Sequence, residues 1–515
     1  MPLNGEVPIP RLVSLLRRDL EAARFSAESL VSLWGADAAA AERRAQRVPA
    51  IRATSGFAEQ APLAMLARFF VLGLPVPRPA LEAALPSLGV DGVLALSLGA
   101  GDTVIRPLME LRPHSFVDSA GVGSWLIASD LGETVTGAAL REDHVLGVGG
   151  ASSTLASLMI HRQVESVLDL GTGCGIQALH SSRHARRVVA TDISARALDI
   201  ARLNARLNAV TNIEFRLGSL FDPVVGERFD HIVSNPPFVI TPRLATVPAY
   251  EYRDGGMVGD DLVAAVIGGV AGHLTPGGIA QLLGNWEYRG EGNGLDRVGA
   301  WIDAVDGGLD AWVVEREVQD AALYAETWIR DGGTRPGPAF DTLYGAWLDD
   351  FATRDVRGVG FGYLTLRRPD SAALRGQESA RLRRLESLPG RLGHNPSGLG
   401  EHLDSALAAH DALAATGDDA LLLRHFEVAP DVTEERHYWP GAEDPTVMTL
   451  HQGGGFGRSV PLDTALAAFV GACDGDLAAA AIIDAIAQLL EADAAALRDE
   501  LLPQLRELAL TGFLR

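Results

Sequence analysis

Residues 165–192, which read ESVLDLGTGCGIQALHSSRHARRVVATD, decide the fold predicted for this chain. Residues 167–170, which are apolar except for Asp169, indicate a buried strand, and the glycines that follow form a tight turn into a helix. A second strand then ends at Asp192. In such a β-α-β unit, glycines let backbone N–H groups approach a ligand, and an acidic residue about 20 positions further on binds ribose hydroxyls. A nucleoside cofactor is therefore expected.

A glycine-rich turn alone leaves open a dinucleotide-binding domain or a tight connection without a ligand. Residues 229–234 are expected to form another buried parallel strand, and Asn235, Pro236, Pro237 and Phe238 follow it. The prolines stiffen this loop. The Asn235 amide oxygen can accept hydrogen bonds from a planar NH2 group, and the Phe238 ring can stack on that group. The loop is predicted to clamp an amide or amino nitrogen at the carboxyl edge of the sheet.

Three motifs, LDLGTGCG (168–175), TDIS (191–194) and NPPF (235–238), resemble the class I S-adenosylmethionine-dependent methyltransferases that modify planar nitrogens. Members with an Asn-Pro-Pro-Tyr/Phe loop act on glutamine amides, adenine N6 or guanine N2. Residues 252–262 are also similar to the Gly-Gly-x-x-Gly-Leu stretch of the release-factor glutamine methyltransferases. The resemblance covers about residues 140–370.

The resemblance implies an enzyme with a Rossmann-like, seven-stranded α/β sheet and S-adenosylmethionine as its cofactor. It assigns catalysis to the acceptor loop, Asn235, Pro236, Pro237 and Phe238. It implies cofactor binding by Asp169, Gly171, Thr172, Gly173, Gly175, Ile176, Asp192, Ile193, Ser219, Leu220 and Asn235. Two departures leave the substrate open. Ser219 stands where the family usually has an acidic residue, and a glycine-rich approach at 144–154 replaces the family's Pro-Arg-Pro-Glu-Thr-Glu segment.

Methyl transfer from a sulfonium is an in-line displacement that needs little acid or base catalysis. Positioning is expected to supply most of the rate, because well-oriented reactants gain about 7–11 kcal/mol. No nucleophilic side chain is required. Cys174 is therefore expected to be a small buried residue of the turn rather than a nucleophile.

The composition narrows the class of protein. The formal net charge of the 515 residues is −22, and all 44 basic residues are Arg, which argues against extended phosphate-backbone contact. Two cysteines provide neither a disulfide framework nor a zinc site, so no metal is expected. No charged leader and no run of about 18 apolar residues are found, which predicts a cytoplasmic protein without a membrane span.

Pattern changes predict three domains: residues 1–135, mainly helical; residues 136–370, the methyltransferase domain; and residues 371–515, an α+β domain. In the first domain, strands near 103–111 and 123–129 follow short helices. This order fits either a winged-helix unit or a helical cap on the sheet.

An insertion near 319–356 separates two strands, 312–318 and 360–368, that are expected to form the terminal antiparallel hairpin of the sheet. Insertions of this length are usually functional or folded in their own right. Its aromatic residues could line a substrate groove or form a helix core: Trp328, Tyr344 and Trp347.

The last domain begins with an Arg-rich stretch, Arg375 to Arg391, expected to be a solvated helix or linker, with nucleic-acid contact as the alternative. Strands are predicted near 421–429 and 446–452. Three helices are predicted near 462–472, 476–491 and 494–512, with Asp476 and Asp493 as N-caps of the last two. This order again resembles a winged helix.

Three functions follow from these features. The leading one is an S-adenosylmethionine-dependent N-methyltransferase that acts on a glutamine amide of a protein, a class favoured by the NPPF loop and the acidic charge. The alternative is an RNA or DNA methyltransferase for adenine N6 or guanine N2, with terminal domains that bind nucleic acid. A non-catalytic binding protein is the least favoured, because the cofactor turn and the acceptor loop are both intact.

Overall fold

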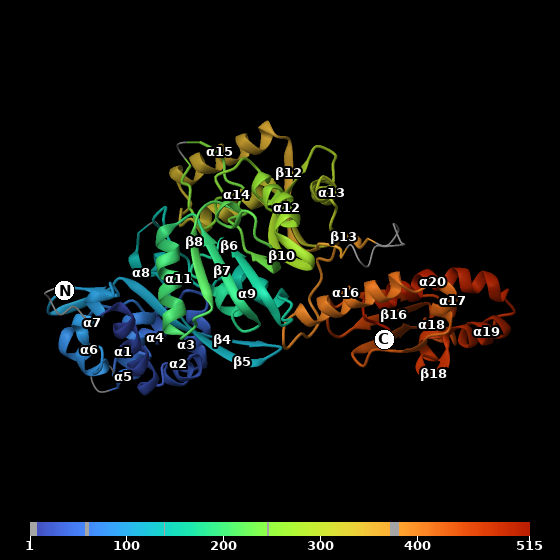
Figure 1. Cartoon of the computed structure of the whole chain (residues 1–515), viewed down its shortest axis with the longest axis horizontal. Coiled ribbons are helices and arrows are strands. Elements are labelled where there is room, and N and C mark those ends of the chain that lie inside the picture. Colours follow the sequence, from blue (N-terminus) through green and yellow to red (C-terminus); the bar gives the residue numbers. More distant parts are fainter. Residues whose placement is uncertain (1–7, 57–60, 139, 245–246, 371–380) are drawn as a thin grey trace. The chain divides into compact units, whose positions relative to one another are not determined.

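The computed structural model describes residues 8–56, 61–138, 140–244, 247–370 and 381–515. The chain divides into two compact units. Unit 1 comprises residues 1–156, 162–375 and 383–387, and unit 2 comprises residues 157–161, 376–382 and 388–515. Figure 1 shows the elements of both units along the chain.

Eight strands form the central sheet of unit 1, in the order β13-β11-β12-β10-β9-β6-β7-β8 (Figure 1). Strand β12 runs antiparallel to β10 and β11, and the other pairings are parallel. The Rossmann-like α/β sheet and the terminal antiparallel pair are therefore confirmed. The strands are β6 (Val164–Leu170), β7 (Ala185–Asp192), β8 (Ile213–Leu217), β9 (Phe229–Ser234), β10 (Leu274–Arg289), β11 (Asp310–Asp320), β12 (Val356–Arg367) and β13 (Arg383–Ser387).

Strand β13 makes the sheet one strand larger than the seven predicted. Arg383 and Arg384 were expected in a solvated helix or linker, but they begin this edge strand, which pairs with β11. The Trp312 indole N–H donates to Glu386 at 2.7 Å, and the Arg384 guanidinium lies over the Trp312 ring. The short run RRLES can pair at an edge although its charges suggest solvent. Arg375 lies outside the described residues.

Helices pack against this sheet in two groups. The helices α12 (Asp261–His273) and α13 (Gly294–Asp303) form one hydrophobic cluster with β6, β9, β10 and β11. The helices α10 (Ile176–Ser181) and α11 (Ala195–Leu207) contact β6, β7 and β8 and belong to a second cluster. Short elements α8 (Glu133–Thr136), α9 (Gly150–Leu158) and η2 (Asp222–Val224) lie in the connections.

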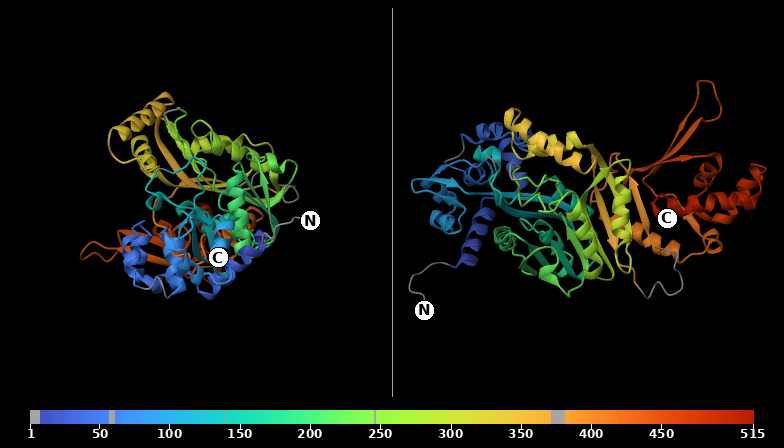
Figure 2. Two further views of the ribbon diagram at one scale, coloured as in Figure 1. Left: turned by 90° about the vertical axis from the view of Figure 1, so that its left-hand side faces the viewer. Right: turned by 90° about the horizontal axis from the view of Figure 1, so that it is seen from above.

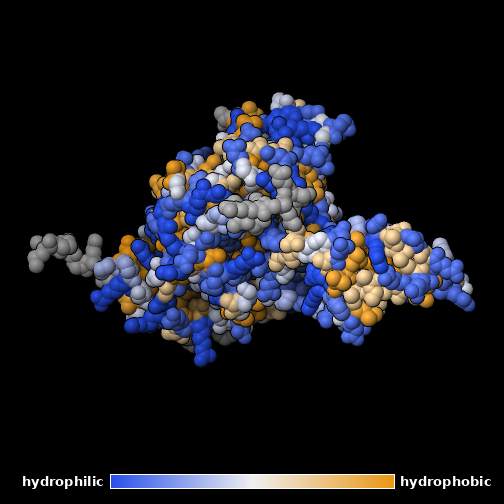
Figure 3. Space-filling model, turned by 45° about the vertical axis from the view of Figure 1, so that its right-hand side comes forward, coloured by the Kyte–Doolittle hydropathy of each residue, from blue (hydrophilic) through white to orange (hydrophobic). Residues whose placement is uncertain are grey.

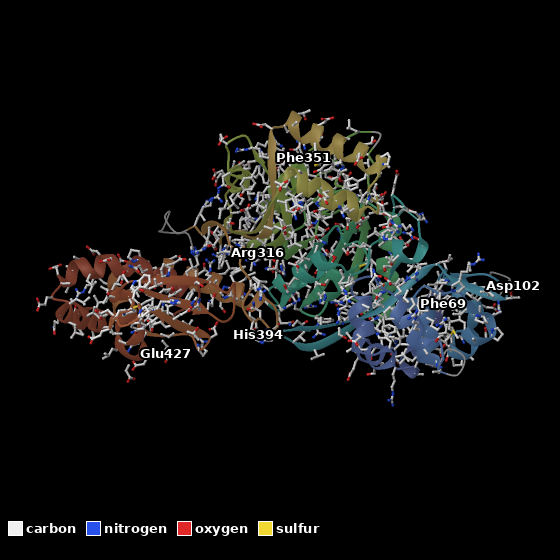
Figure 4. The ribbon with its side chains drawn as sticks, turned by 180° about the vertical axis from the view of Figure 1, so that it is seen from behind. Phe69, Asp102, Arg316, Phe351, His394 and Glu427 are labelled. Carbon is white, nitrogen blue, oxygen red and sulfur yellow. The ribbon has the colours of Figure 1, made fainter. Side chains whose placement is uncertain are left out.

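The second cluster joins α10 and α11 to the N-terminal elements. Phe69, labelled in Figure 4, is fully buried in it, together with Leu16, Ile176 and Ile200. The elements are α1 (Ile9–Ala22), α2 (Ala27–Trp34), α3 (Ala36–Glu42), α4 (Val48–Thr54), α5 (Pro62–Leu66), η1 (Ala67–Val71), β1 (Val76–Pro77), α6 (Arg78–Ala84), α7 (Gly89–Ala95), β2 (Gly99–Ala100), β3 (Val104–Pro107), β4 (Met109–Asp118) and β5 (Gly121–Asp130). This continuous core matches the alternative of a helical cap.

The N-terminal segment also contains a small sheet in the order β1-β3-β2. Along the chain, helices α5 and η1 precede β1, and helices α6 and α7 lie between β1 and β2. The winged helix stays a prediction, with which this order is compatible. Strands β4 and β5 form a long hairpin. The strand predicted near 123–129 lies within β5, whereas the stretch predicted near 103–111 is divided between β3 and the first residues of β4.

The insertion between β11 and β12 folds into α14 (Ala321–Asp331) and α15 (Pro338–Thr353). Trp347 and Phe351, the latter labelled in Figure 4, are each 1% exposed and pack in a cluster with Val239 and Ile240. Trp328 and Tyr344 are partly buried against the same cluster. The aromatic residues therefore form a helix core, which covers the chain just after Phe238.

Unit 2 has its own core, in which helices α18, α19 and α20 bury Phe426 and Phe513. Its hairpin β15–β16 extends away from these helices (Figure 2), and hydrophobic residues gather on the face of unit 2 that Figure 3 shows. Its elements are α16 (Gly400–Ala414), α17 (Asp418–Leu422), β14 (His425–Glu427), β15 (Val432–His437), β16 (Val447–Gln452), β17 (Ser459–Leu462), α18 (Thr464–Gly471), β18 (Asp474–Ala478), α19 (Ala479–Leu489) and α20 (Ala494–Leu510).

Two sequence predictions for unit 2 were wrong. The predicted strand near 421–429 is shorter, because Leu421 and Leu422 are the last residues of helix α17 and only His425–Glu427 forms a strand. A short apolar run does not distinguish a buried helix turn from a strand. Asp476 lies in β18, which pairs with β14, so α19 begins after Ala478 instead. Asp493 does cap α20, because its side chain accepts a hydrogen bond from the Ala496 N–H at 2.8 Å.

Within the described ranges, no helix is long and apolar enough to cross a membrane. Over the same ranges, no three His, Cys, Asp or Glu side chains gather in a way that could hold a metal ion.

Candidate active site

A cavity of about 200 Å³ lies at the carboxyl ends of β6, β7 and β9. Parallel α/β sheets bind ligands at this edge, where the strand order reverses. The sequence-predicted residues on its wall are Gly171, Thr172, Gly173, Ile176, Asp192, Ile193, Ser219, Leu220, Asn235, Pro236 and Pro237. The cofactor turn and the acceptor loop therefore share one cavity.

The glycine turn needs its glycines for two separate reasons. Gly171, Gly173 and Gly175 have φ angles of 75°, 54° and 88°, which side-chain-bearing residues rarely adopt. At Gly175, a Cβ would also meet Cβ of Ala201 at 3.0 Å. Gly175 is therefore a packing residue between the turn and α11, whereas Gly171 and Gly173 present their backbone to the cavity.

Asp169 lies behind the turn rather than on the cavity wall. Its carboxylate is 1% exposed and accepts a hydrogen bond from the Thr172 hydroxyl at 2.5 Å. Burial raises the pKa of Asp169 to about 7, although the Thr172 hydrogen bond opposes this shift. Asp169 thus holds the shape of the turn, and the structure does not bring it into contact with the cavity.

Asp192 is on the wall and is already oriented by two backbone groups. Its carboxylate accepts from the Gly173 N–H at 2.9 Å and from the Ser194 N–H at 2.9 Å. Burial raises the pKa of Asp192, and the hydrogen bonds from Ser194 and Gly173 oppose that shift. The next residue, Ile193, is 62% exposed although apolar. A carboxylate beside an exposed apolar face can bind a hydroxyl-bearing ring and an adjacent planar base.

Ser219 and Leu220 form the neighbouring part of the wall, after β8. The Gly218 N–H donates to the Asp192 carbonyl oxygen at 3.0 Å, which fixes this loop to the end of β7. Leu220 has a φ of 45°, an unusual conformation for a residue with a side chain. Ser219, which stands where related methyltransferases usually have an acidic residue, gives this part of the wall a hydroxyl instead of a carboxylate. The loop is nevertheless held in place by the Gly218 hydrogen bond.

Asn235 provides a buried polar atom on the cavity wall. Its side-chain oxygen Oδ1 is buried and has no hydrogen-bond partner among the described residues. The loop around it is tight, because the Phe238 N–H donates to the Pro236 carbonyl oxygen at 2.7 Å. An unsatisfied buried acceptor costs about 1–3 kcal/mol, so such atoms usually mark a ligand or water position. The ligand group that faces Oδ1 has to be a hydrogen-bond donor.

Phe238 is half-buried, and its ring is not part of the cavity wall formed by the described residues. The ring packs instead against Phe361 of β12, with ring centroids 5.6 Å apart. The next two residues are fixed by backbone hydrogen bonds: the Val239 N–H donates to the Arg253 carbonyl and the Ile240 N–H donates to the Tyr324 hydroxyl. The structure therefore brings three of the four NPPF residues to the cavity.

Several wall residues have no counterpart among the predicted site residues: His144, Ser152, Gln177, Glu251, Tyr252 and Met257. Tyr252 packs edge-on to His144, with ring centroids 5.9 Å apart, and the Glu251 N–H donates to the Glu142 carbonyl at 2.9 Å. Burial lowers the pKa of His144. The resemblance of residues 252–262 to the release-factor enzymes was the sequence signal for the segment that carries Tyr252 and Met257. A lone Gln or His in a sequence carries no comparable signal.

Arg253 fixes the loop that carries Tyr252 to the insertion. Its guanidinium donates to the Trp328 carbonyl at 2.9 Å and to Asp331 at 2.7 Å, and it lies 4.7 Å from the Tyr250 ring centroid. Arg253 is itself buried. Helix α14 of the insertion thus supports the loop that carries Tyr252.

Cys174 also lines the cavity, with its thiol 4% exposed. Burial raises the pKa of Cys174 to about 11, so the thiol is neutral near pH 7. The expectation of a small buried cysteine agrees with this environment.

Three families match separate segments of the chain. Residues 147–249 match the family described as Methyltransferase small domain. Residues 22–104 and 407–515 match families described as Domain of unknown function (DUF7059) and Domain of unknown function (DUF7782).

Among named relatives, the chain is 39% identical over 136 residues to "Release factor glutamine methyltransferase" of Xylella fastidiosa, which covers 25% of this chain and 49% of the relative. It is 36% identical over 150 residues to "Ribosomal protein uL3 glutamine methyltransferase" of Bradyrhizobium diazoefficiens, over 27% of this chain and 46% of the relative. The chain spans about half the length of these relatives. The resemblance to class I methyltransferases is confirmed for the central region.

Solved structures that resemble the chain include a methyltransferase from Pyrococcus furiosus. It has 17% sequence identity and a TM-score of 0.25, over 41% of this chain and 78% of that one. The strand order of the central sheet identifies the fold.

Proposed function

We propose that this chain is an S-adenosylmethionine-dependent methyltransferase that transfers a methyl group to a planar nitrogen, a glutamine side-chain amide of a protein. The observation that carries the proposal is the buried, unpaired Oδ1 of Asn235 on the wall of the cavity that the glycine turn forms. An amide NH2 group has donors that can satisfy this oxygen.

The residues of the cavity fit the cofactor group by group. Asp192 accepts hydrogen bonds from ribose hydroxyls, and Ile193 with Leu220 provides an apolar surface for the base. Gly171 and Gly173 leave room for close approach of the ligand to the backbone. When bound, S-adenosylmethionine supplies an electrophilic methyl group on a sulfonium centre.

Asn235 performs the positioning step of the reaction. Its Oδ1 accepts a hydrogen bond from the substrate NH2 group, which turns the nitrogen lone pair toward the cofactor side of the cavity. The new C–N bond would form as the S–CH3 bond of the cofactor breaks, which leaves a neutral thioether. The nitrogen that gains the methyl group would become positively charged, and the same oxygen would stabilise that charge more strongly than in the ground state, before a proton passes from the nitrogen to solvent. The neutral Cys174 thiol and the buried Asp169 take no part in bond making. Positioning of this kind contributes about 7–11 kcal/mol in well-oriented reactions.

Two features support a protein substrate. The named relatives modify glutamine in proteins of translation, a release factor and a ribosomal protein, by their printed names. The net charge of −22 disfavours tight contact with a phosphate backbone. A substrate among translation proteins also favours action in the cytoplasm.

A nucleic-acid substrate is the second candidate. The order of helices and short strands around β1, α6, α7 and β3 favours it, because winged-helix units of this order contact DNA, RNA or protein. The acceptor would then be adenine N6 or guanine N2, whose exocyclic NH2 group satisfies Asn235 Oδ1 equally well.

Methyl transfer to a cell lysate distinguishes the two candidates. The full chain is incubated with S-adenosylmethionine labelled in its methyl group, and the product is treated with protease or with nuclease. We expect macromolecular label that protease releases and nuclease leaves intact, with a methylated glutamine found by mass spectrometry. Label that only nuclease releases would establish the second candidate. Absence of label with both lysate fractions, beside normal binding of the cofactor, would favour a binding protein.

A further inference from the structure

Gln177 is the second residue of α10 and stands on the cavity wall with 3% of its surface exposed. Its side-chain Nε2 donates a hydrogen bond to the Ser152 carbonyl oxygen at 2.7 Å. This bond determines the orientation of the amide, because only the nitrogen can donate to a carbonyl. The other amide atom, Oε1, has to point away from Ser152.

The oxygen Oε1 of Gln177 is buried and has no hydrogen-bond partner among the described residues. A buried acceptor without a partner is unfavourable, and an amide oxygen can accept hydrogen bonds but cannot donate them. The described wall residues therefore include three unsatisfied acceptor atoms: Asn235 Oδ1, Gln177 Oε1 and Asp254 Oδ2. The Asp254 carboxylate is already in an ion pair with Arg243, whereas no cation among the described residues donates to the Gln177 oxygen. The ligand group that pairs with it has to be a donor.

The arrangement of the wall indicates which donor this is. A methyl sulfonium cofactor carries a nucleoside, a methyl group and an amino-acid chain on one sulfur atom. The end of β7 at Asp192 fits the nucleoside, and the end of β9 at Asn235 fits the methyl acceptor. The rest of the wall includes the segment around His144, the loop of Glu251 and Tyr252, and the pair Ser152 and Gln177. Gln177 follows the glycine turn directly in α10, so we assign this pair to the amino-acid chain. The donor on that chain is its ammonium group.

We propose that Gln177 Oε1 binds the ammonium group of the cofactor's amino-acid chain and that Ser152 and Gln177 form a subsite for it. The inference rests on the proposed function, because it takes S-adenosylmethionine as the ligand. It assigns a polar role to a segment in which the chain departs from the release-factor enzymes: the approach at 144–154 holds Gln177 in its orientation through the Ser152 carbonyl.

Calorimetry on the full chain with two ligands tests this subsite. S-adenosylhomocysteine has the complete amino-acid chain, and its desamino analogue lacks only the amino group. We expect the wild-type chain to bind S-adenosylhomocysteine roughly tenfold to a hundredfold more tightly, the factor expected for one hydrogen bond to a charged group. In Gln177→Met, which keeps the length of the side chain but cannot accept this bond, the ratio of the two affinities should fall below about threefold.

The ratio is informative because both ligands share every other contact, so a general change in the shape of the cavity cancels. Asp192→Ala is the matched control, since it should weaken both ligands by a similar factor and preserve their ratio. Equal affinity of both ligands for the wild-type chain, or an unchanged ratio in Gln177→Met, would overturn the inference. If the wild-type chain binds neither ligand, the proposed function itself fails. Thermal unfolding of each variant checks that it is folded.

Discussion

The Asp192 carboxylate accepts a hydrogen bond from the Gly173 N–H and also lies on the cavity wall. The same group therefore orders the glycine turn and is available to a ligand. The acidic residue and the glycines were predictable because few residue types suit a nucleoside site at that spacing. The different roles of the residues within this motif were not predictable. Asp169 and Gly175 belong to the same motif as Gly171, yet Asp169 holds Thr172 and Gly175 packs on Ala201. Sequence spacing places residues in one turn but does not determine which side of the turn each one faces.

Replacing Asp192 by Ala should lower the affinity for S-adenosylhomocysteine about tenfold to a hundredfold, because hydrogen bonds to a charged group contribute about 1.5–3 kcal/mol. Asp192→Asn keeps an acceptor for one of the two backbone N–H groups and should fall between the wild type and Ala. Calorimetry gives both constants. Unchanged affinity in Asp192→Ala, or a preference of the wild-type chain for NAD, would contradict the assignment of the turn to this cofactor.

The pKa of Asp169, raised by burial to about 7, makes a prediction for the chain without ligand. In the unfolded chain this carboxyl titrates near its ordinary value, about 4, so the folded state binds the proton more tightly. The stabilisation is fully present below that value and is lost as the pH rises to about 7. Asp169→Asn cannot lose a proton. Its Tm relative to the wild type should therefore rise between about pH 4 and about pH 7, and a constant difference over that range would show that the folded carboxyl titrates near its ordinary value.

At the scale of elements, the insertion α14–α15 decides how firmly the acceptor loop is held. Tyr324, which is 3% exposed, accepts hydrogen bonds from the Ile240 N–H at 3.0 Å and from the Asn285 side chain at 2.7 Å. Its hydroxyl therefore connects α14 to β10 and to the chain just after NPPF. The existence of the insertion was predictable from the gap between two apolar strands. Its contact with residues 239–240 was not, because long-range packing leaves no local pattern.

Tyr324→Phe should lower the free energy of unfolding by about 1–3 kcal/mol, since the buried Ile240 N–H loses its acceptor. The rate of methyl transfer should fall as well, because the residues next to Phe238 become less restrained. Tyr344→Phe, on the other helix of the insertion, is the control and should leave both unchanged. Thermal unfolding and a labelled-methyl assay measure the two effects. A Tyr324→Phe variant with wild-type stability and rate would show that this contact does not support the loop.

Strand β13 and helix α19 show where local patterns fail at this scale. The run RRLES was expected in solvent because it is charged, yet it completes the sheet by backbone pairing with β11. Edge pairing depends on the neighbouring strand and needs little from the side chains. Asp476 had the residue type of an N-cap, but pairing of β18 with β14 extends the chain through it. Tertiary contacts outweighed local preference in both places.

At the scale of the whole molecule, the N-terminal elements share a core with α10 and α11. Asn204 of α11 connects them directly: its side chain accepts from the Ala128 N–H at 2.7 Å and donates to the Ala128 and Cys174 carbonyls. The N-terminal segment is therefore bound to the back of the cofactor turn. The domain boundary near residue 135 stays a prediction, because a continuous core does not by itself define where folding units end.

The distribution of charge predicts how the molecule responds to RNA. Arg383 donates to Asp303 at 3.0 Å, and Arg384 donates to Glu386 at 2.7 Å, so both are in ion pairs. With a net charge of −22, we expect no measurable affinity for bulk ribosomal RNA near physiological salt. Filter binding over a salt series tests this. Tight and steeply salt-dependent binding that is lost when Arg381, Arg383 and Arg384 become Ala would favour the nucleic-acid substrate.

We propose that different residues of one cavity bind the two reactants: the glycine turn and Asp192 bind the cofactor, and Asn235 binds the acceptor nitrogen. The most direct measurement compares Asn235→Ala with the wild-type chain in two assays on the same preparation, calorimetric binding of S-adenosylmethionine and labelled-methyl transfer to the protein fraction of a lysate. We predict that the cofactor affinity changes by less than about threefold while transfer falls to background, because Oδ1 addresses the acceptor. If Asn235→Ala keeps most of the wild-type rate of methyl transfer, this proposal is contradicted and the NPPF loop is only a rigid turn.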